Sequence, residues 1–264
     1  MENSVRIVKK WGEILEKVVS NQDKKVIIKV EGIRKVYNLG QEKVIALDNI
    51  DLDIYKGEIL CIFGTSGSGK STLLNMLAGL EKPTRGSVMI GKTDITKLNE
   101  SQLALFRQKH IGFVFQSYNL LNIMTSLENV AMPLMFKGID KKTRNRAAKK
   151  MLKEVGLENR LNHKPNQMSG GQQQRVGIAR AFVGNPKIVF ADEPTGNLDS
   201  KTTIEVMELM CRMSKEHEQT IILVSHDPEI ANYADRIVHL IDGNIKSIKV
   251  NDKNNRNEGI ENEE

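Results

Sequence analysis

The sequence reads Gly64-Thr65-Ser66-Gly67-Ser68-Gly69-Lys70-Ser71 between an apolar run, residues 59–63, and a helix-forming segment, residues 70–80. This stretch matches the pattern G-x-x-x-x-G-K-[ST], in which glycines let backbone N–H groups turn toward a chain of phosphates. The helix that follows adds the positive potential of its N-terminus. Lys70 supplies a charge for the β- and γ-phosphates, and Ser71 supplies a hydroxyl ligand for Mg²⁺. The flanking strand and helix favour a P-loop over a glycine-rich turn with an accidental lysine.

Two further apolar runs end in polar residues, KIVFADEP at 187–194 and TIILVSHD at 220–227. In an open parallel sheet, ligands gather at the carboxyl ends of the strands, so these ends are expected near the P-loop. Asp192 is predicted to hold the Mg²⁺ shell, and Glu193 to orient and deprotonate the attacking water. A neutral imidazole of His226 would contact the γ-phosphate and hold the water. The alternatives are a surface loop for the acidic pair and a structural role for the histidine.

A second predicted helix begins after the stretch Ser169-Gly170-Gly171-Gln172. Ser169 can cap this helix, which gives a second helix N-terminus suited to an anion. The P-loop already binds the phosphates of one nucleotide, so the second N-terminus is expected to serve the nucleotide of another molecule. A simple N-capped helix is the alternative that the local pattern leaves open.

The composition is that of a globular protein, with 39% hydrophobic and 27% charged residues. The apolar runs are too short to cross a bilayer, and the first ten residues lack an apolar signal core. The net charge of +6 permits anionic partners but does not indicate a nucleic-acid binder. Cys61 and Cys211 lie far apart without metal-ligand companions, so buried thiols in a reducing cytosol are expected.

The chain is expected to hold one large α/β domain, residues 26–250, with a helical subdomain at about 119–183. Residues 1–25 are predicted to form an amphipathic helical extension, which packs on its own domain or contacts a membrane surface. The tail, residues 251–264, has almost no apolar content and is predicted to be disordered.

Five motifs occur in the order and spacing of ATP-binding subunits of ABC transporters: GTSGSGKST, Gln116, MSGGQQQR, VFADEPTGNLDS and SHD. The chain resembles that family over about residues 28–247. The resemblance implies a P-loop NTPase with a RecA-like core, an antiparallel β-subdomain and an inserted helical subdomain. It also implies ATP hydrolysis coupled to transport, with ATP and Mg²⁺ as cofactors. Two copies, or one copy and a paired ABC subunit, would form a head-to-tail dimer in which each ATP lies between one P-loop and the partner's SGGQ segment.

The resemblance assigns roles to further residues of this sequence. Tyr37 matches the aromatic residue that stacks on adenine, and Thr72 completes the phosphate-binding motif. Gln116 matches the glutamine that contacts Mg²⁺ and senses the transmembrane partner, and Asp199 matches the aspartate that links the two sites of the dimer. Met168 stands where the family usually has leucine, a change that conserves volume and is expected to have little effect. The predicted catalytic residues are thus Lys70, Glu193 and His226, and the predicted metal ligands are Ser71, Gln116 and Asp192.

Longer segments resemble the lipoprotein-release and macrolide-export branch of the family, the LolD/MacB type, which is similar to relatives in antimicrobial-peptide resistance. The segments are ALDNIDLDIYKGE, IGFVFQSYNLL, SLENVAMPL, RVGIARAF and ADEPTGNLDSKT. This resemblance implies a membrane permease partner of the FtsX-like or MacB type and a place at the cytoplasmic face of the cell membrane. Tyr118 and Asn122-Ile123 depart from the family pattern in the expected permease-contact region, which leaves the particular partner open.

Two alternative functions remain at this point. A soluble ABC protein that acts on ribosomes or DNA usually carries two fused cassettes or long coiled coils, whereas this chain has one P-loop motif and no sustained heptads. A conventional importer permease is the other alternative, and the sequence leaves it open because the ATP-hydrolysing subunit does not contact the cargo.

Overall fold

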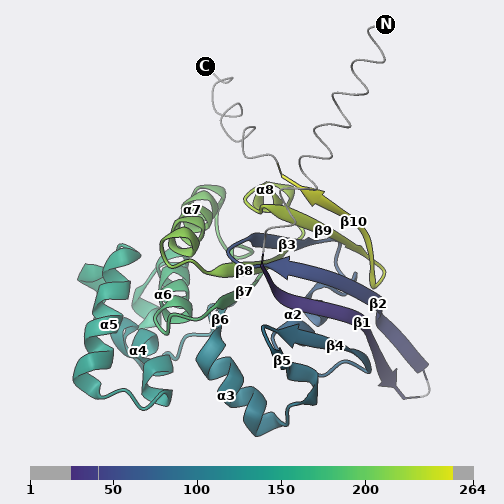
Figure 1. Ribbon diagram of the computed structural model, residues 1–264. Helices are drawn as coiled ribbons and strands as arrows, with labels where there is room; N and C mark the ends of the chain where they lie inside the picture. Colours follow the sequence, from purple (N-terminus) through teal and green to yellow (C-terminus); the bar gives the residue numbers. More distant parts are fainter. Residues whose placement is uncertain (1–24, 41, 252–264) are drawn as a thin grey trace, which may run out of the picture.

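A six-stranded sheet forms the centre of the described part of the chain, residues 25–40 and 42–251 of the computed structural model (Figure 1). Its order is β10-β9-β3-β8-β7-β6; the strands from β9 to β6 run parallel, and β10 is antiparallel to β9. The strands are β3 (Ile59–Phe63), β6 (Ile111–Phe115), β7 (Ile188–Asp192), β8 (Thr220–Ser225), β9 (Arg236–Ile241) and β10 (Asn244–Val250). The carboxyl ends of the parallel strands therefore share one edge.

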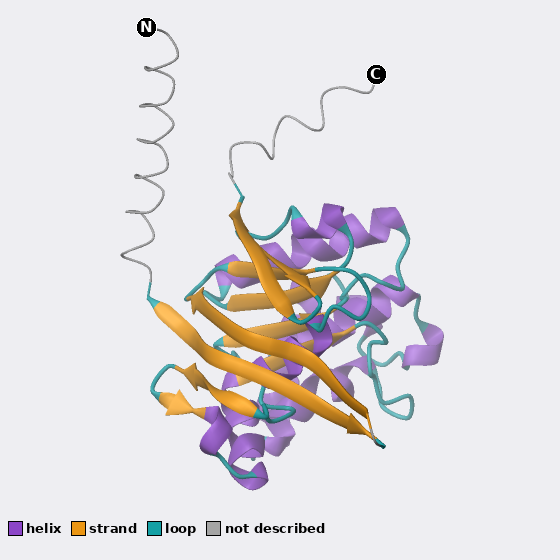
Figure 2. Ribbon diagram, turned by 90° about the vertical axis from the view of Figure 1, so that its right-hand side faces the viewer, coloured by secondary structure: helices purple, strands orange, loops and turns teal. Residues whose placement is uncertain are grey.

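A four-stranded antiparallel sheet, ordered β2-β1-β4-β5 in the described residues, lies against one face of the central sheet (Figure 2). Its strands are β1 (Val26–Leu39), β2 (Glu42–Tyr55), β4 (Arg85–Ile90) and β5 (Thr93–Asp94). Irregular register between β1 and β2 bends this long pair.

The helices between β6 and β7 gather at one side of the molecule (Figure 1, left). They are α4 (Ser126–Phe136), α5 (Lys141–Glu154) and α6 (Gly170–Phe182), with the short 3₁₀ turns η2 (Glu158–Arg160) and η3 (Pro165–Gln167). The other helices are α2 (Lys70–Leu77), α3 (Glu100–His110), α7 (Ser200–Glu216) and α8 (Pro228–Ala231), and η1 is Ile95–Lys97. Capping boxes at Asn99, Thr125 and Ser169 fix where α3, α4 and α6 begin.

The two faces of the central sheet contribute to two apolar clusters, as the alternation of side chains along a strand requires. In β7, Ile188 and Phe190 belong to the cluster shared with α2 and the antiparallel sheet. Val189 and Ala191 belong to the cluster shared with α6 and α7. Because both faces are covered, the parallel strands read as continuous apolar runs, and β8 is buried along its whole length.

The architecture confirms the predicted α/β fold with an antiparallel sheet and an inserted group of helices. The exact boundaries, including about 119–183 for the insertion, stay predictions. Nearly all of the predicted N-terminal extension and tail, residues 1–24 and 252–264, lies outside the described residues. Within the described ranges, no helix combines the length and the apolar character that crossing a bilayer demands.

The two cysteines lie in different surroundings. Cys61 is fully buried in β3, and burial raises the pKa of its thiol to about 12. Cys211, on α7, is only half-buried, so the expectation of burial is wrong for this residue.

Candidate nucleotide-binding site

A cavity of about 690 Å³ lies at the carboxyl ends of β3, β7 and β8. Residues 44–46, 63–67 and 69–72, Glu193 and His226 line it. The structure therefore brings the P-loop together with two of the strand-end residues that the sequence singled out. Ser68, the remaining P-loop residue, is buried instead of lining the cavity.

The P-loop requires glycine where it turns into α2. Gly69 has φ +98°, and a Cβ at this position would lie 2.5 Å from the carbonyl oxygen of Ala46. As the N-cap residue, Gly69 has no side chain to cap the helix, which leaves the N-terminus of α2 open toward the cavity. Lys70 is 6% exposed, and its Nζ donates to the carbonyl oxygen of Thr65 at 2.8 Å, so the ammonium group is held across the loop. The geometry suits a chain of phosphates.

Ser71 and Asp192 meet beside the P-loop. The Ser71 hydroxyl donates to Asp192 Oδ1 at 3.2 Å. The pKa of Asp192 is raised, mainly by burial and in part by the charge of Glu193. The hydrogen bond from Ser71 and the charge of Lys70 act against this shift. A hydroxyl and a carboxylate are the kind of oxygen ligands that Mg²⁺ takes together with substrate phosphates. Among the described residues, no group of three or more His, Cys, Asp or Glu side chains lies together in a way that could hold a metal ion.

Glu193 and His226 form a pair that lines the cavity. His226 Nδ1 lies 3.0 Å from Glu193 Oε1; the side chain of His226 is 63% exposed and that of Glu193 24%. Glu193 has φ +43°, a left-handed conformation that is uncommon for a residue with a side chain. Its backbone N–H donates to the carbonyl oxygen of Val224 at 3.2 Å, which fixes this turn against β8. The carboxylate is thus directed by a strained turn toward the histidine.

Tyr37 does not line the cavity. Its hydroxyl donates to Glu81 Oε2 at 2.8 Å, and the Lys35 ammonium lies 5.0 Å from the centre of its ring. Burial is the main cause that raises the pKa of Tyr37. The neighbouring strand β2 instead lines the cavity with Val44 and Ile45, whose exposed fractions are 42% and 48%. The sequence analysis did not identify Val44 and Ile45 as site residues, although two adjacent apolar residues in a polar stretch of strand were a usable signal. The contact of Tyr37 with adenine stays a prediction.

Gln116 and Asp199 lie outside the lining of the cavity. The backbone oxygen of Gln116 accepts a hydrogen bond from Asn197 Nδ2 at 3.0 Å, so the residue after β6 is tied to the segment after Glu193. Asp199 caps α7, where its carboxylate accepts from the backbone N–H of Thr202 at 3.0 Å and from the Thr202 hydroxyl at 2.7 Å. These bonds lower the pKa of Asp199.

The Ser169–Gln172 segment also lies apart from the cavity. Ser169 Oγ accepts from the Gln172 N–H at 3.3 Å, and Gln172 Oε1 accepts from the Ser169 N–H at 3.2 Å. Ser169 is exposed and Gly170 half-buried, so the N-terminus of α6 is open to another molecule. The Ser169–Gln172 segment therefore does not share the lining of the P-loop cavity, and its binding of an anion stays a prediction.

Comparison with known proteins gives consistent results. A family model described as ABC transporter matches residues 47–196. An uncharacterized ABC transporter ATP-binding protein of Methanocaldococcus jannaschii, MJ1508, is 50% identical over 84% of this chain and 99% of its own length. The lipoprotein-releasing system ATP-binding protein LolD of Geobacter metallireducens is 45% identical over 83% of this chain and 97% of its own length. The dimeric structure of a post-hydrolysis state of the ATP-binding cassette MJ0796 bound to ADP and Pi matches with a TM-score of 0.79 and 44% identity, over 84% of this chain and 98% of that one.

Proposed function

This chain belongs to the ABC transporter family, as an ATP-binding and ATP-hydrolysing subunit. We propose that Glu193 is the general base of ATP hydrolysis. We also propose that a second subunit completes each nucleotide-binding site. The observation that carries the proposal is the placement of Glu193 and His226 in the lining of the P-loop cavity. The paired subunit is a second copy of this chain or a related ABC subunit, and their closure drives a membrane permease.

The P-loop binds the phosphates of ATP. The N–H groups of residues 64–69 and the N-terminus of α2 stabilise the negative charge, and Lys70 exchanges its bond to Thr65 for the β- and γ-phosphates. Thr72 lines the same wall, and Tyr37 is assigned to adenine. Ser71, Gln116 and Asp192 would hold Mg²⁺, which neutralises developing charge on the phosphates when it is bound. The bond between Ser71 and Asp192 places two of these three groups together already.

Hydrolysis is an attack of water on the γ-phosphorus. The Glu193 carboxylate accepts a proton from the water as its oxygen bonds to phosphorus, and the bond to the bridging oxygen of ADP breaks. His226 orients Glu193 through the 3.0 Å contact and contacts the γ-phosphate with its other nitrogen. The products are ADP and inorganic phosphate.

The second subunit supplies the residues 169–172 to the open side of each nucleotide. Ser169, which caps α6, is exposed and does not line the chain's own cavity, which suits an anion that belongs to a partner. Asp199, two residues after the Asn197 that donates to the backbone oxygen of Gln116, would then report on the partner site. The arrangement makes full hydrolysis depend on dimer closure.

The permease partner is of the lipoprotein-release type, FtsX-like or MacB-like, and this subunit lies at the cytoplasmic face of the membrane through that partner. The likeness to a lipoprotein-releasing ATP-binding protein over almost its whole length supports this assignment.

The substitution Glu193→Gln tests the assignment of the base. The full chain should still bind ATP but lose hydrolysis by on the order of 10²–10⁴-fold, because the amide cannot accept the proton. Dimers should accumulate with ATP and be visible by light scattering after size-exclusion chromatography. Glu216→Gln, an exposed change at the end of α7, is the matched control and should behave as wild type. Wild-type hydrolysis by Glu193→Gln would refute the role of Glu193.

The requirement for a partner has its own test. A variant that carries both Ser169→Glu and Gly170→Glu places two negative charges where the partner's phosphates would lie. It should keep ATP binding to its own P-loop and lose hydrolysis when tested alone. Full activity of this variant, or turnover at the wild-type rate by a strict monomer, would contradict the dimer mechanism.

A further inference from the structure

Gln174, on the second turn of α6, is a polar side chain that is fully buried. Its amide Nε2 donates to the carbonyl oxygen of Pro194 and, at 3.3 Å, to that of Phe115. Carbonyl oxygens only accept, so the nitrogen of the amide must be the atom that faces them. Burying such a group is unfavourable unless its hydrogen bonds are made, so this side chain is fixed by these two contacts.

The two acceptors flank the predicted machinery of hydrolysis. Pro194 directly follows Glu193, and Phe115 directly precedes Gln116. Gln174 itself lies five residues after Ser169, about 7.5 Å along the helix axis from the N-terminus of α6. One buried amide thus connects the helix that faces the partner's nucleotide with the turn of the base and the loop of Gln116.

Other contacts make α6 and the Gln116 loop one unit. Arg180, two turns further along α6, donates to the carbonyl oxygens of Tyr118 at 2.7 Å and Asn119 at 2.6 Å. This fastens the far side of the same loop. Gln174 and Arg180 both bind this loop, but Gln174 also donates to the carbonyl oxygen of Pro194. A shift of α6 would therefore displace the carbonyl group next to Glu193.

We propose that Gln174 is a positioning residue that couples engagement of the α6 N-terminus by the partner subunit to the placement of Glu193. The inference rests on the proposed function. When the second subunit's nucleotide binds at Ser169, it fixes the position of α6. Gln174 then holds the Glu193 turn in the position that hydrolysis requires. Without that amide, the nucleotide binds at the P-loop as before, but the base is not held against the attacking water.

A purely structural role is the competing explanation, and the chain contains a matched control for it. Gln219 is also a buried glutamine, 1% exposed, whose amide donates to the carbonyl oxygen of a proline, Pro186, at 2.9 Å. Its second acceptor is Asn185 Oδ1 at 3.4 Å. In both glutamines, Oε1 has no hydrogen-bond partner among the described residues. Gln219, however, lies at the amino end of β8, away from the cavity.

The experiment compares Gln174→Met with Gln219→Met in the full chain. Methionine keeps the unbranched shape and removes the donors, so both variants should lower the unfolding temperature by a similar few degrees. Gln174→Met should lower kcat for ATP hydrolysis, per folded molecule, by on the order of 10²-fold and leave the Kd for ATP within about threefold, because only the placement of the base is lost. Gln219→Met should keep kcat within about twofold.

Two outcomes overturn the inference: a kcat of Gln174→Met within about twofold of wild type, or an equal loss of kcat in Gln219→Met. If Gln174→Met does not fold, Gln174→Asn takes its place, since its shorter amide cannot reach both carbonyls. Failure here is separable from failure of the proposed function. If Glu193→Gln abolishes hydrolysis while Gln174→Met does not, the base assignment stands and only the coupling role is lost. Wild-type hydrolysis by Glu193→Gln would remove both.

Discussion

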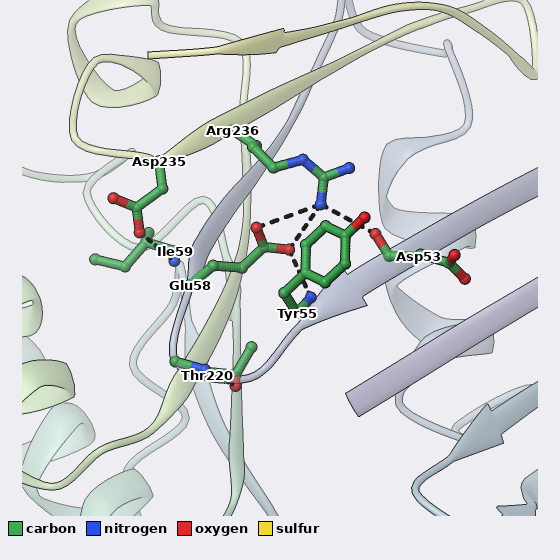
Figure 3. A network of polar contacts seen from close by, with 8 residues as sticks. Asp53, Tyr55, Glu58, Ile59, Thr220, Asp235 and Arg236 are labelled. Atoms are coloured by element: carbon green, nitrogen blue, oxygen red, sulfur yellow. Dashed lines mark hydrogen bonds and ion pairs between the residues drawn. The ribbon is translucent and has the colours of Figure 1, made fainter. Parts of the chain in front are cut away.

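The polar side chains at the two ends of the central sheet differ in their exposure to solvent. At the carboxyl end, Glu193 and His226 border an open cavity, with the histidine side chain 63% exposed and Glu193 at a positive φ. At the amino end, Glu58 and Arg236 form an ion pair whose side chains are only 3% and 9% exposed (Figure 3). One end keeps its polar groups available to a ligand, and the other satisfies them within the fold.

The amino-end network joins strands from both sheets. Arg236 Nη1 donates to Glu58 Oε1 at 2.9 Å and to the carbonyl oxygen of Asp53 at 3.0 Å, and the guanidinium lies 4.9 Å from the centre of the Tyr55 ring (Figure 3). Glu58 Oε1 also accepts from the Tyr55 N–H at 2.8 Å. The side chain of Asp235 accepts from the Ile59 N–H at 2.9 Å, which fixes the start of β3.

This contrast separates the end of the sheet that supports function from the end that supports stability. A site that must release ADP and bind ATP again keeps its polar groups beside an open cavity, and it keeps the backbone of Glu193 in a strained conformation. The ion pair and hydrogen bonds at the amino end stabilise the pairing of β3, the strand before the P-loop, with β8 and β9. They therefore also keep the carboxyl end of the sheet in place. Substitutions at the amino end are therefore expected to change stability, and those at the carboxyl end to change activity.

The largest predicted effect on stability is that of Arg236→Met. It removes the Arg236 cation from the buried carboxylate of Glu58, which should lower the free energy of unfolding by about 3–5 kcal/mol. Because the cavity is at the other end of the sheet, kcat per folded molecule should stay within about twofold. Urea denaturation and ATPase assays on the same samples measure both quantities. A large loss of kcat in folded protein would break the separation of the two ends.

A double variant sharpens the same point. Glu58→Gln together with Arg236→Met removes both charges and keeps an oxygen that accepts from the Tyr55 N–H. Most of the stability lost in Arg236→Met should return, because the penalty comes from a charge that stays buried after Arg236 is removed and not from a missing attraction. If the double variant is as unstable as the single one, the charge of Glu58 is not the cause.

The carboxyl end is also the part that the sequence predicted best. The spacing of Gly64, Gly69 and Lys70 and the polar residues at the ends of two apolar runs are local signals, and the fold brings these strand ends to one edge. The amino-end pair has no such signal. Glu58 and Arg236 are 178 residues apart, and only the strand order makes them neighbours.

Two site details depended on side-chain direction, which sequence patterns do not fix. Gln174 belongs to the quoted motif MSGGQQQR, but its burial depends on how α6 is rotated against β6 and β7. Likewise, β1 and β2 pair Tyr37 with Val44, and it is Val44 that lines the cavity. In both cases the packing, and not the sequence pattern, decides which of several neighbouring side chains makes the contact.

A second prediction concerns the backbone strain at Glu193, whose φ is +43°. Glycine adopts this conformation freely, whereas alanine does not, so Glu193→Gly should be more stable than Glu193→Ala by about 1 kcal/mol. At an ordinary position the order is reversed, because glycine loses more entropy on folding. Both variants lack the carboxylate and should be inactive, so chemical denaturation is the deciding measurement. Greater stability of the alanine variant would show that the turn holds no strain.

The smallest predicted effect concerns Asp192, whose pKa is raised above its ordinary value of 3.8, mainly by burial. The native state therefore binds this proton more tightly than the unfolded chain does. The resulting stability is fully present below the ordinary pKa and is lost as the pH rises through the raised value. At neutral pH the charge lowers stability, and because Asp192 is only half-buried, solvent screens part of that cost.

Asp192→Asn should accordingly raise the free energy of unfolding at pH 7 by about 0.2–1 kcal/mol, and the gain should shrink toward zero as the pH falls below the ordinary pKa. Asp140, which caps α5, provides the opposite case, because hydrogen bonds from Thr143 lower its pKa. The Asp140 carboxylate therefore supports stability above its ordinary pKa, and Asp140→Asn should give no gain at pH 7. Denaturation curves for both variants across acid and neutral pH are the measurement. A gain at pH 7 in Asp192→Asn and none in Asp140→Asn is expected, and the absence of a gain in Asp192→Asn would contradict an electrostatic cost at Asp192.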